Sequence, residues 1–201
     1  MCNLYRMTKS TSEIANLFAA IDSMQGSNLG SEVYPGYPGA VVVDGEARSM
    51  VWGFPLAQKS KRTGEPLKPR SVNNARTDKL DSFMWRYSFE ERRCLIPLTA
   101  WAEAEGPKGS KTRTWMSLPD AELFACAGLW RNSDEWGPCY TMVMTDAAGE
   151  AAEVHNRMPV ILRADDYDQW QNGEPDEAKA LCTGWTGPLT IERTEEPWSK
   201  R

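Results

Sequence analysis

The sequence has very little histidine and no closely spaced cysteines. His155 is the single histidine among 201 residues, and no CxxC pair occurs. A zinc site usually takes four ligands from Cys and His at short spacings, so the sequence argues against one. An odd number of widely separated cysteines also argues against a disulfide framework; they are Cys2, Cys94, Cys126, Cys139 and Cys182. We therefore expect chemistry that uses no metal.

Long apolar runs and the common phosphate-binding and hydrolase motifs are also absent. No run approaches the roughly 18 apolar residues of a membrane span, and the first ten residues, MCNLYRMTKS, lack the apolar stretch of a signal peptide. Neither GxGxxG nor GxxxxGK occurs, and there is no GxSxG elbow. These absences predict a cytoplasmic protein without a membrane partner.

The composition predicts one folded domain, residues 1–201, since 41% hydrophobic and 25% charged residues are ordinary values for globular proteins. Ser10 and Glu13 form a capping-box pattern that predicts a helix over 11–21. Strands at 40–43 and 47–52 flank Gly45 and predict a hairpin. The polar stretch 54–75, with three prolines, predicts a long surface loop, and 79–87 a short helix.

After residue 93 the chain is dominated by short segments rich in aromatic and β-branched residues. We expect strands at 94–97, 99–103, 112–118, 123–130, 140–145 and 159–162, and helices at 164–171 and 176–182. Strands outnumber helices and do not alternate with them regularly. The expected class is therefore α+β, with an antiparallel, barrel-like sheet and a few flanking helices.

The charge is unevenly distributed along the chain. The net charge is −5, but residues 59–93 hold ten Lys and Arg against five Asp and Glu, whereas residues 165–201 hold nine acids against four bases. Trp85, Tyr87 and Phe89 are interleaved with the basic residues. Such a stretch is either a solvated face or a groove for single-stranded nucleic acid, which combines cations with aromatic rings.

Cys2 is the most informative candidate for chemistry. Removal of Met1 leaves Cys2 with an α-amine and a thiol on adjacent carbons, whose ordinary pKa values are about 7.7–8.0 and about 8.5. The amine attacks an aldehyde to give a Schiff base, and the thiol then closes a thiazolidine ring. The alternative is a second residue in a frayed terminus.

Three further residues have both a functional and an ordinary interpretation. His155 is the one side chain whose unperturbed pKa lies in the physiological range, or it is a hydrogen-bonded loop residue. Glu103 moves protons if it points inward, or is a strand-end carboxylate if it points outward. Asn74 lies in Asn73-Asn-Ala-Arg76, which alone indicates an Asx-type turn.

Several motifs occur in an order that resembles the SOS-response-associated peptidase (SRAP) family. They are the initial Met-Cys, Val51-Trp-Gly-Phe-Pro55, Asn74-Ala-Arg76, Arg92-Arg-Cys-Leu-Ile-Pro97 with Glu103 six residues later, Thr145 ten residues before His155, and His155-Asn-Arg-Met-Pro-Val-Ile-Leu162. Each match is weak or moderate by itself. The ordered set covers residues 2 to about 162.

The resemblance implies binding of single-stranded DNA and covalent capture of abasic sites as a thiazolidine, which protects the lesion in the DNA-damage (SOS) response. It implies removal of Met1 by peptidase activity and leaves lyase activity open. Cys2 would be the nucleophile, Asn74 would hold the amino terminus and the sugar, Glu103 would move protons, and His155 would protonate the sugar oxygen. Thr145 would support the site. Arg76, Arg86 and Arg157 would contact phosphates, and Trp52 would shape the groove or stack on a base. The resemblance implies no metal or cofactor, and a monomer is expected.

The sequence departs from the family pattern at Asn3, Leu4, Glu32, Val51 and Ala104, and two of these changes remove basic contacts. Fewer phosphate contacts weaken DNA binding and its salt dependence. Two other functions remain open. One is a cysteine peptidase acting in trans with Cys2, His155 and Asn74; the other is a non-covalent single-strand-binding module.

Overall fold

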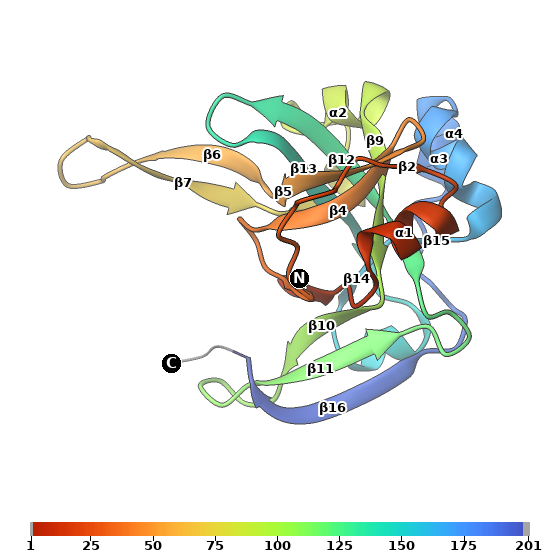
Figure 1. Ribbon diagram of the computed structural model, residues 1–201. Helices are drawn as coiled ribbons and strands as arrows, with labels where there is room; N and C mark the ends of the chain where they lie inside the picture. The colour runs from red at the N-terminus through yellow and green to blue at the C-terminus, as the bar shows by residue number, and fades with distance from the viewer. Residues whose placement is uncertain (1, 199–201) are drawn as a thin grey trace.

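The computed structural model describes residues 2–198, and its centre is a closed barrel of five strands (Figure 1). The strands pair antiparallel in the order β13-β12-β9-β4-β5, and a parallel pairing of β5 with β13 closes the ring at Trp52 and Tyr140. They are β4 (Pro38–Val43), β5 (Glu46–Trp52), β9 (Arg93–Leu98), β12 (Phe124–Ser133) and β13 (Gly137–Asp146). Short strands extend this sheet: β2 (Ile21–Asp22), β8 (Asn74–Arg76), β14 (Arg157–Pro159) and β15 (Ile161–Leu162).

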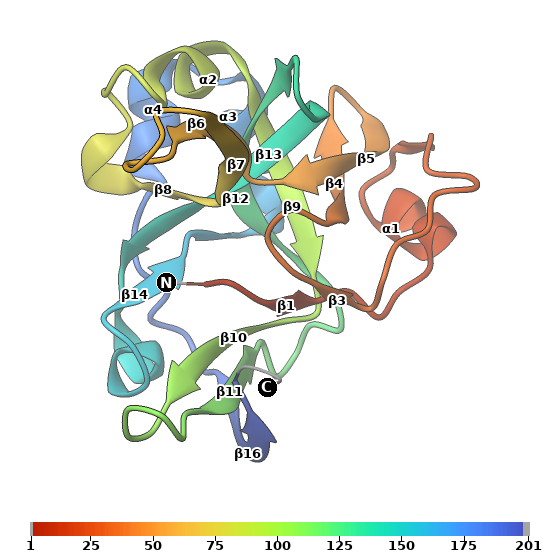
Figure 2. The same ribbon diagram turned by 90° about the vertical axis from the view of Figure 1, so that its left-hand side faces the viewer.

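A second, antiparallel sheet lies beside the barrel and contains the amino-terminal strand. Its order is β16-β11-β10-β1-β3, with β16 (Thr190–Pro197), β11 (Thr112–Ser117), β10 (Ala100–Glu105), β1 (Tyr5–Arg6) and β3 (Glu32–Val33). Figure 2 shows the start of the chain running between the barrel and β10. Residue 2 is therefore enclosed by both sheets rather than projecting from the molecule.

The α+β class and the strands expected after residue 93 are confirmed. The expected segment 159–162 is divided into β14 and β15, because Val160 donates its N–H to Val143 of β13 and accepts a hydrogen bond from Ala127 of β12. The chain thus crosses from one barrel strand to the next at this residue. β16 was not expected, since most of its side chains are exposed and it lacks an apolar face.

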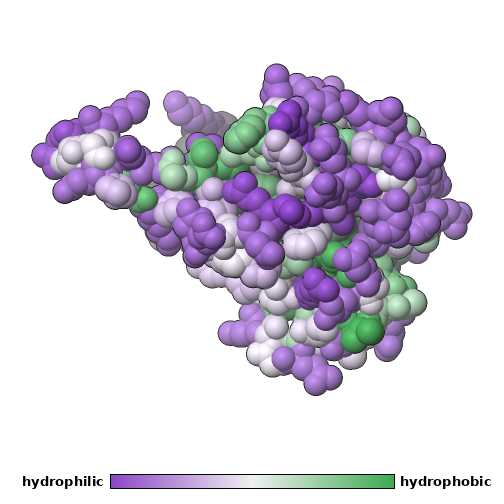
Figure 3. Space-filling model, turned by 90° about the horizontal axis from the view of Figure 1, so that it is seen from above, coloured by the Kyte–Doolittle hydropathy of each residue, from purple (hydrophilic) through white to green (hydrophobic). Residues whose placement is uncertain are grey.

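The expected loop over 54–75 is wrong. Residues 54–72 form a hairpin of β6 (Phe54–Lys59) and β7 (Pro66–Val72) that projects from the barrel, and β8 follows it (Figures 1 and 3). Beyond Pro55 most side chains of the ribbon are exposed, so the sequence lacks the alternation of a half-buried strand. A two-stranded ribbon also tolerates proline, because each strand has a free edge.

The helices are short and lie outside the barrel. They are α1 (Thr11–Leu17), α2 (Arg86–Glu91), α3 (Tyr167–Asn172) and α4 (Pro175–Ala180), with 3-10 turns at Thr77–Lys79, Gly149–Glu153 and Ala164–Asp166. α3 and α4 confirm the two carboxyl-terminal predictions. The capping box of α1 is present, with both Ser10–Glu13 hydrogen bonds formed. Among the described residues, no helix is long and apolar enough to cross a membrane.

Two helix predictions had the wrong bounds. α1 ends before residue 21 because Ala19 adopts a left-handed φ of 48°, and Ile21 pairs instead with β5. The helix expected over 79–87 is absent, and α2 starts at Arg86. Leu80 and Trp85 are both buried, although a continuous helix would place residues five apart about 140° from each other.

The barrel interior is tightly filled beside Gly128 of β12. A Cβ atom at this position would lie 2.7 Å from Cys94 Sγ and 2.7 Å from Ile96 Cγ1, both on β9. These side chains are buried and have no open space to move into. The absence of a side chain at residue 128 therefore allows β9 and β12 to pack.

We expect Gly128→Ala to lower the free energy of unfolding by about 1–3 kcal/mol, because the added methyl group overpacks the barrel. Urea denaturation followed by circular dichroism measures the change. Ala57→Ser, which adds one heavy atom at an exposed position of β6, is the control and should unfold like the wild type. Equal stability of Gly128→Ala and the wild type would contradict the packing argument.

Candidate active site around Cys2

Cys2 is fully buried between the two sheets. Its Sγ donates to the carbonyl oxygen of Leu4 at 3.4 Å, and the N–H of Ala102 on β10 donates to the same oxygen at 3.0 Å. Burial, together with the nearby charge of Glu103, raises the pKa of the Cys2 thiol far above its usual value. The sulfur is therefore kept as a thiol in this arrangement.

Two adjacent asparagines hold the backbone of Cys2. The Nδ2 atoms of Asn73 and Asn74 both donate to the Cys2 carbonyl oxygen, at 3.0 and 2.8 Å. Asn74 belongs to β8, which pairs in parallel with β13. Trp52 Nε1 donates to the Asn73 carbonyl at 3.0 Å and so holds this segment against the barrel. Asn73 was missed as a site residue; its place beside Asn74 in the Asn-Asn pair is the one sequence signal that points to it.

Glu103 points inward, which resolves the alternative that the sequence left open. It lies on β10 opposite Thr114 of β11, and its side chain is only 2% exposed. Burial raises the pKa of the Glu103 carboxyl to about 7. The group is therefore partly protonated near neutral pH and is able to give or take a proton.

His155 lies next to Glu103. Its Nε2 is 4.0 Å from Glu103 Oε2, and its Nδ1 accepts the N–H of Arg157 at 3.0 Å. Nδ1 also lies 3.2 Å from the Arg157 carbonyl oxygen, so the backbone of residue 157 holds the ring in place and Nε2 faces the carboxyl group. Burial lowers the pKa of His155, so the neutral ring is favoured.

Arg76 and Arg157 reach the same end of β13 from opposite sides. Arg76 lies on β8 and pairs with Met144 of β13, and Arg157 lies on β14 and pairs with Asp146 of β13. Arg76 makes two hydrogen bonds to Asp78, at 2.9 and 2.7 Å, and Arg157 Nε lies 3.3 Å from Asp146 Oδ1. Both aspartates are exposed, so a phosphate is able to replace them as the partner of either guanidinium group.

Arg86 and Thr145 are two expected site residues that lie outside this cluster or have another role. Arg86 is exposed on α2, where its guanidinium stacks over the Tyr87 ring, and Figure 2 shows α2 on the far side of the barrel from the amino terminus. Thr145 is buried and donates to the carbonyl oxygen of Cys182 at 3.3 Å. It therefore ties β13 to the segment after α4.

Trp52 was expected to shape the groove or to stack on a base, and its burial makes the second alternative wrong. Its side chain is fully buried, with the Tyr5 ring edge-on at 5.0 Å and the Tyr140 ring stacked at 6.4 Å. Trp85 and Phe89 are also buried, so the basic stretch does not present three aromatic rings to solvent. Trp52 contributes to the site through its hydrogen bond to Asn73.

No group of three or more His, Cys, Asp or Glu side chains that could hold a metal ion occurs within residues 2–198. The cluster of Cys2, Glu103 and His155 combines a buried thiol with two groups able to exchange protons near neutral pH. The paired amides fix the backbone of residue 2, and a carboxyl group with a pKa near neutrality lies beside it.

Comparison with solved structures shows that the fold is shared. A protein from Bacteroides thetaiotaomicron superposes with a TM-score of 0.80 at 19% identity, covering 96% of this chain and 91% of that one. A protein from Bordetella bronchiseptica superposes with a TM-score of 0.78 at 22% identity, covering 96% and 99%.

Sequence comparison identifies the family. The abasic site processing protein YoqW of Bacillus subtilis is 34% identical over 118 residues, which are 54% of this chain and 52% of that protein, so the match spans about half of YoqW. The abasic site processing protein YoaM of the same organism is 31% identical over 156 residues, 71% and 66% of the two chains. The family model described as SOS response associated peptidase (SRAP) matches residues 1–194, and the chain belongs to this family.

Proposed function

We propose that this protein processes abasic sites in single-stranded DNA by covalent capture at Cys2. The observation that carries the proposal is the clamped backbone of residue 2: two amides hold its carbonyl oxygen, next to a buried carboxyl group whose pKa is about 7. The names of the related proteins YoqW and YoaM support the choice of lesion.

The reaction needs a free α-amine on Cys2, so Met1 must first be removed. Met1 lies outside the described residues, and its removal by the protein's own peptidase activity is part of the proposal. The amine then adds to the aldehyde of the opened sugar, and the carbinolamine loses water to give a Schiff base. The thiol adds to the C=N carbon, its proton passes to the nitrogen, and a thiazolidine is formed with one water released in total.

Each described residue has a distinct part in this sequence. Asn73 and Asn74 hold the Cys2 carbonyl, so the amine and the thiol stay in one orientation. Glu103 protonates the departing hydroxyl group and accepts a proton from the attacking amine. His155, once it has taken up a proton, donates it to the sugar oxygen during ring opening and returns to its neutral form. Arg76 and Arg157 contact the flanking phosphates.

The two other functions considered from the sequence receive less support. A cysteine peptidase acting in trans needs the Cys2 thiolate as its first nucleophile, whereas burial raises the pKa of this thiol; in the capture reaction the amine attacks first and the thiol closes the ring afterwards. A non-covalent binding module would not need the backbone of residue 2 to be held in one orientation, as it is by Asn73 and Asn74. Lyase activity would start from the same Schiff base, by removal of a proton from the carbon next to the imine and departure of the 3′ phosphate, and it would need a group that accepts this proton.

Cys2→Ala should abolish covalent capture without abolishing DNA binding. Intact-protein mass spectrometry after incubation with a single-stranded oligonucleotide carrying one abasic site measures the adduct. The wild type should lack Met1 and gain the oligonucleotide mass minus one water. Cys182→Ala is the control, because this cysteine lies after α4 and should leave the adduct unchanged. A wild-type protein that lacks Met1 yet forms no adduct would disprove the proposal.

Glu103→Gln should slow capture by roughly 100-fold or more and change its dependence on pH. In the wild type the free-amine fraction rises with pH through about 7.7–8.0 while the protonated carboxyl fraction falls through about 7, so the rate should pass through a maximum and decline on its alkaline side. The variant lacks this decline. Quenched time courses from pH 5 to 9 measure it, with Glu105→Gln on the same strand as control. A wild-type rate that rises without a maximum up to pH 9, as that of the variant should, would contradict the assigned role.

The same substitution has a separate effect on stability. Because the folded-state pKa of Glu103 is raised, folding binds a proton, and wild-type stability is lost as the pH rises from about 4.5 to about 7. Glu103→Gln removes that loss, so its stability relative to the wild type should increase over this range. Urea denaturation at both ends of the range measures the difference and shows that the variant is folded.

Asn73→Ala and Asn74→Ala should each slow capture by about fivefold, since each removes one hydrogen bond of about 1 kcal/mol that orients residue 2. The double variant should lose more than either single variant. Single-turnover rates of adduct formation measure this. Asn132→Ala, an exposed asparagine of β12, serves as the control. Unchanged rates in both single variants would show that the clamp does not position the nucleophile.

A further inference from the structure

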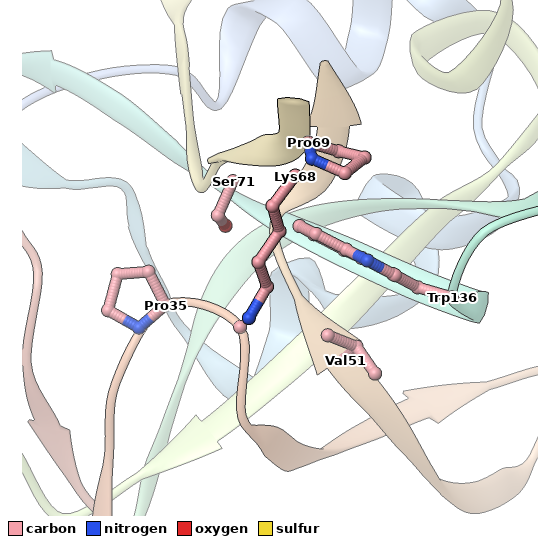
Figure 4. A pocket seen from close by; sticks show the side chains of 7 residues that line it. Pro35, Val51, Lys68, Pro69, Ser71 and Trp136 are labelled. Atoms are coloured by element: carbon pink, nitrogen blue, oxygen red, sulfur yellow. The ribbon is translucent and has the colours of Figure 1, made fainter. Parts of the chain in front are cut away.

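A pocket of about 380 Å³ lies between β7, the turn before β4 and the turn that joins β12 to β13. The side chains labelled in Figure 4 come from these segments and from the end of β5: Pro35, Val51, Lys68, Pro69, Ser71 and Trp136. None of these residues has a role in the capture chemistry described above. The pocket is therefore a separate feature of the surface.

The pocket combines a flat aromatic wall with one cation. Figure 4 shows the Lys68 side chain extending between the Trp136 indole and Pro35. Trp136 is half-buried and Lys68 is exposed, so the indole is held in place while the ammonium group stays hydrated. An aromatic face with an adjacent cation is the arrangement that binds a nucleobase together with its phosphate.

The pocket is joined to the candidate active site through β7. Ser71 precedes Asn73 by two residues, a separation of roughly 7 Å along an extended strand. Trp52 connects them as well: its carbonyl accepts a hydrogen bond from Ser71 Oγ at 3.0 Å, and its Nε1 donates to Asn73 at 3.0 Å. Ser71, which lines the pocket, is thus about the length of one nucleotide from Asn73, which binds the Cys2 carbonyl oxygen.

The charge around the pocket is complementary to DNA. Residues 54–72 hold five Lys and Arg against one Glu, in a chain whose net charge is −5. Figure 3 shows this hairpin standing away from the body of the protein with a largely hydrophilic tip. Asp134 and Glu135 precede Trp136 but do not line the pocket, so Lys68 supplies its charge.

We propose that this pocket binds the nucleotide next to the abasic site, with its base stacked on Trp136 and its phosphate against Lys68. The identity of the strand as DNA rests on the proposed function. The stacking and the charge contact act on undamaged single-stranded DNA too, because they involve neither an aldehyde nor Cys2. Binding at the pocket is therefore measurable without the covalent step.

Fluorescence anisotropy with a labelled, undamaged oligothymidylate tests the stacking contact in the full-length protein. Trp136→Ala should weaken binding by about 5- to 150-fold, the range for loss of one base–aromatic stack. Trp136→Phe keeps an aromatic face and should retain most of the affinity. The thermal midpoint of each variant shows that it is folded. Equal affinity of Trp136→Ala and the wild type, or no binding by the wild type, overturns the proposal.

The salt dependence of binding tests Lys68 separately. Lys68→Gln should reduce the slope of log K against log salt concentration by about 0.7, the value for one phosphate contact on a single strand. Lys108→Gln, an exposed lysine on the turn between β10 and β11, is the matched control and should keep the wild-type slope. Equal slopes for the Lys68→Gln and Lys108→Gln proteins overturn the phosphate contact.

The proposal about the pocket and the proposal of covalent capture are separated by two measurements: binding to undamaged DNA and adduct formation. If the wild type forms no adduct with an abasic oligonucleotide but Trp136→Ala still weakens binding to the undamaged strand, the capture proposal fails and the pocket stands. If adduct formation is normal and neither pocket variant changes binding, the pocket proposal fails and capture stands.

Discussion

The placement of residue 2 inside the molecule is the constraint on which the rest of the site depends. Chain ends usually fray, but here β1 is an internal strand of its sheet, bonded to β3 on one side and β10 on the other. The Tyr5 hydroxyl group is 2.5 Å from that of Tyr140 on the barrel strand β13. Asn73 and Asn74 add two hydrogen bonds to the Cys2 carbonyl. A reactive group at this position therefore has a fixed orientation before any substrate arrives.

The same enclosure determines the protonation of the site. Burial disfavours charge, so it raises the pKa values of Glu103 and Cys2 and lowers that of His155. All three shifts favour the neutral forms. A neutral carboxyl group beside a neutral imidazole suits a reaction in which protons move singly between an amine, a hydroxyl group and a sugar oxygen. The carboxyl pKa of about 7 allows both directions of transfer near neutral pH.

The departures from the family pattern have structural explanations at two positions. Leu4 is buried in a small apolar cluster with Ala102 and Trp115, so the residue at this position serves packing rather than contact with a phosphate. Glu32 lies on the edge strand β3 of the second sheet, and its carboxylate forms ion pairs with the guanidinium groups of Arg6 and Arg113 at 3.5 and 3.2 Å. The projecting hairpin instead carries an excess of positive charge, with five Lys and Arg against one Glu over residues 54–72.

Local signals predicted much of the framework. The capping box at Ser10, the hairpin around Gly45 and the short strands after residue 93 are all present, because each depends on residues near one another in the sequence. The hairpin at 54–72 could not be predicted, since its strands are exposed on both faces and lack alternation. Base stacking by Trp52 was wrong for a related reason: a motif identifies a residue but not whether its ring faces solvent.

The sequence by itself determined which reactive groups exist and in what order: a cysteine at position 2, one histidine, and the asparagine, arginine and glutamate motifs between them. Only the tertiary structure decided that Glu103 points inward, that Asn73 acts with Asn74, and that Arg86 lies on another face. The physical reason is that burial and hydrogen bonding depend on partners far away in the chain. β10 faces residue 2 only because β1 pairs with it across about 95 residues, and β8 is positioned only by its pairing with β13.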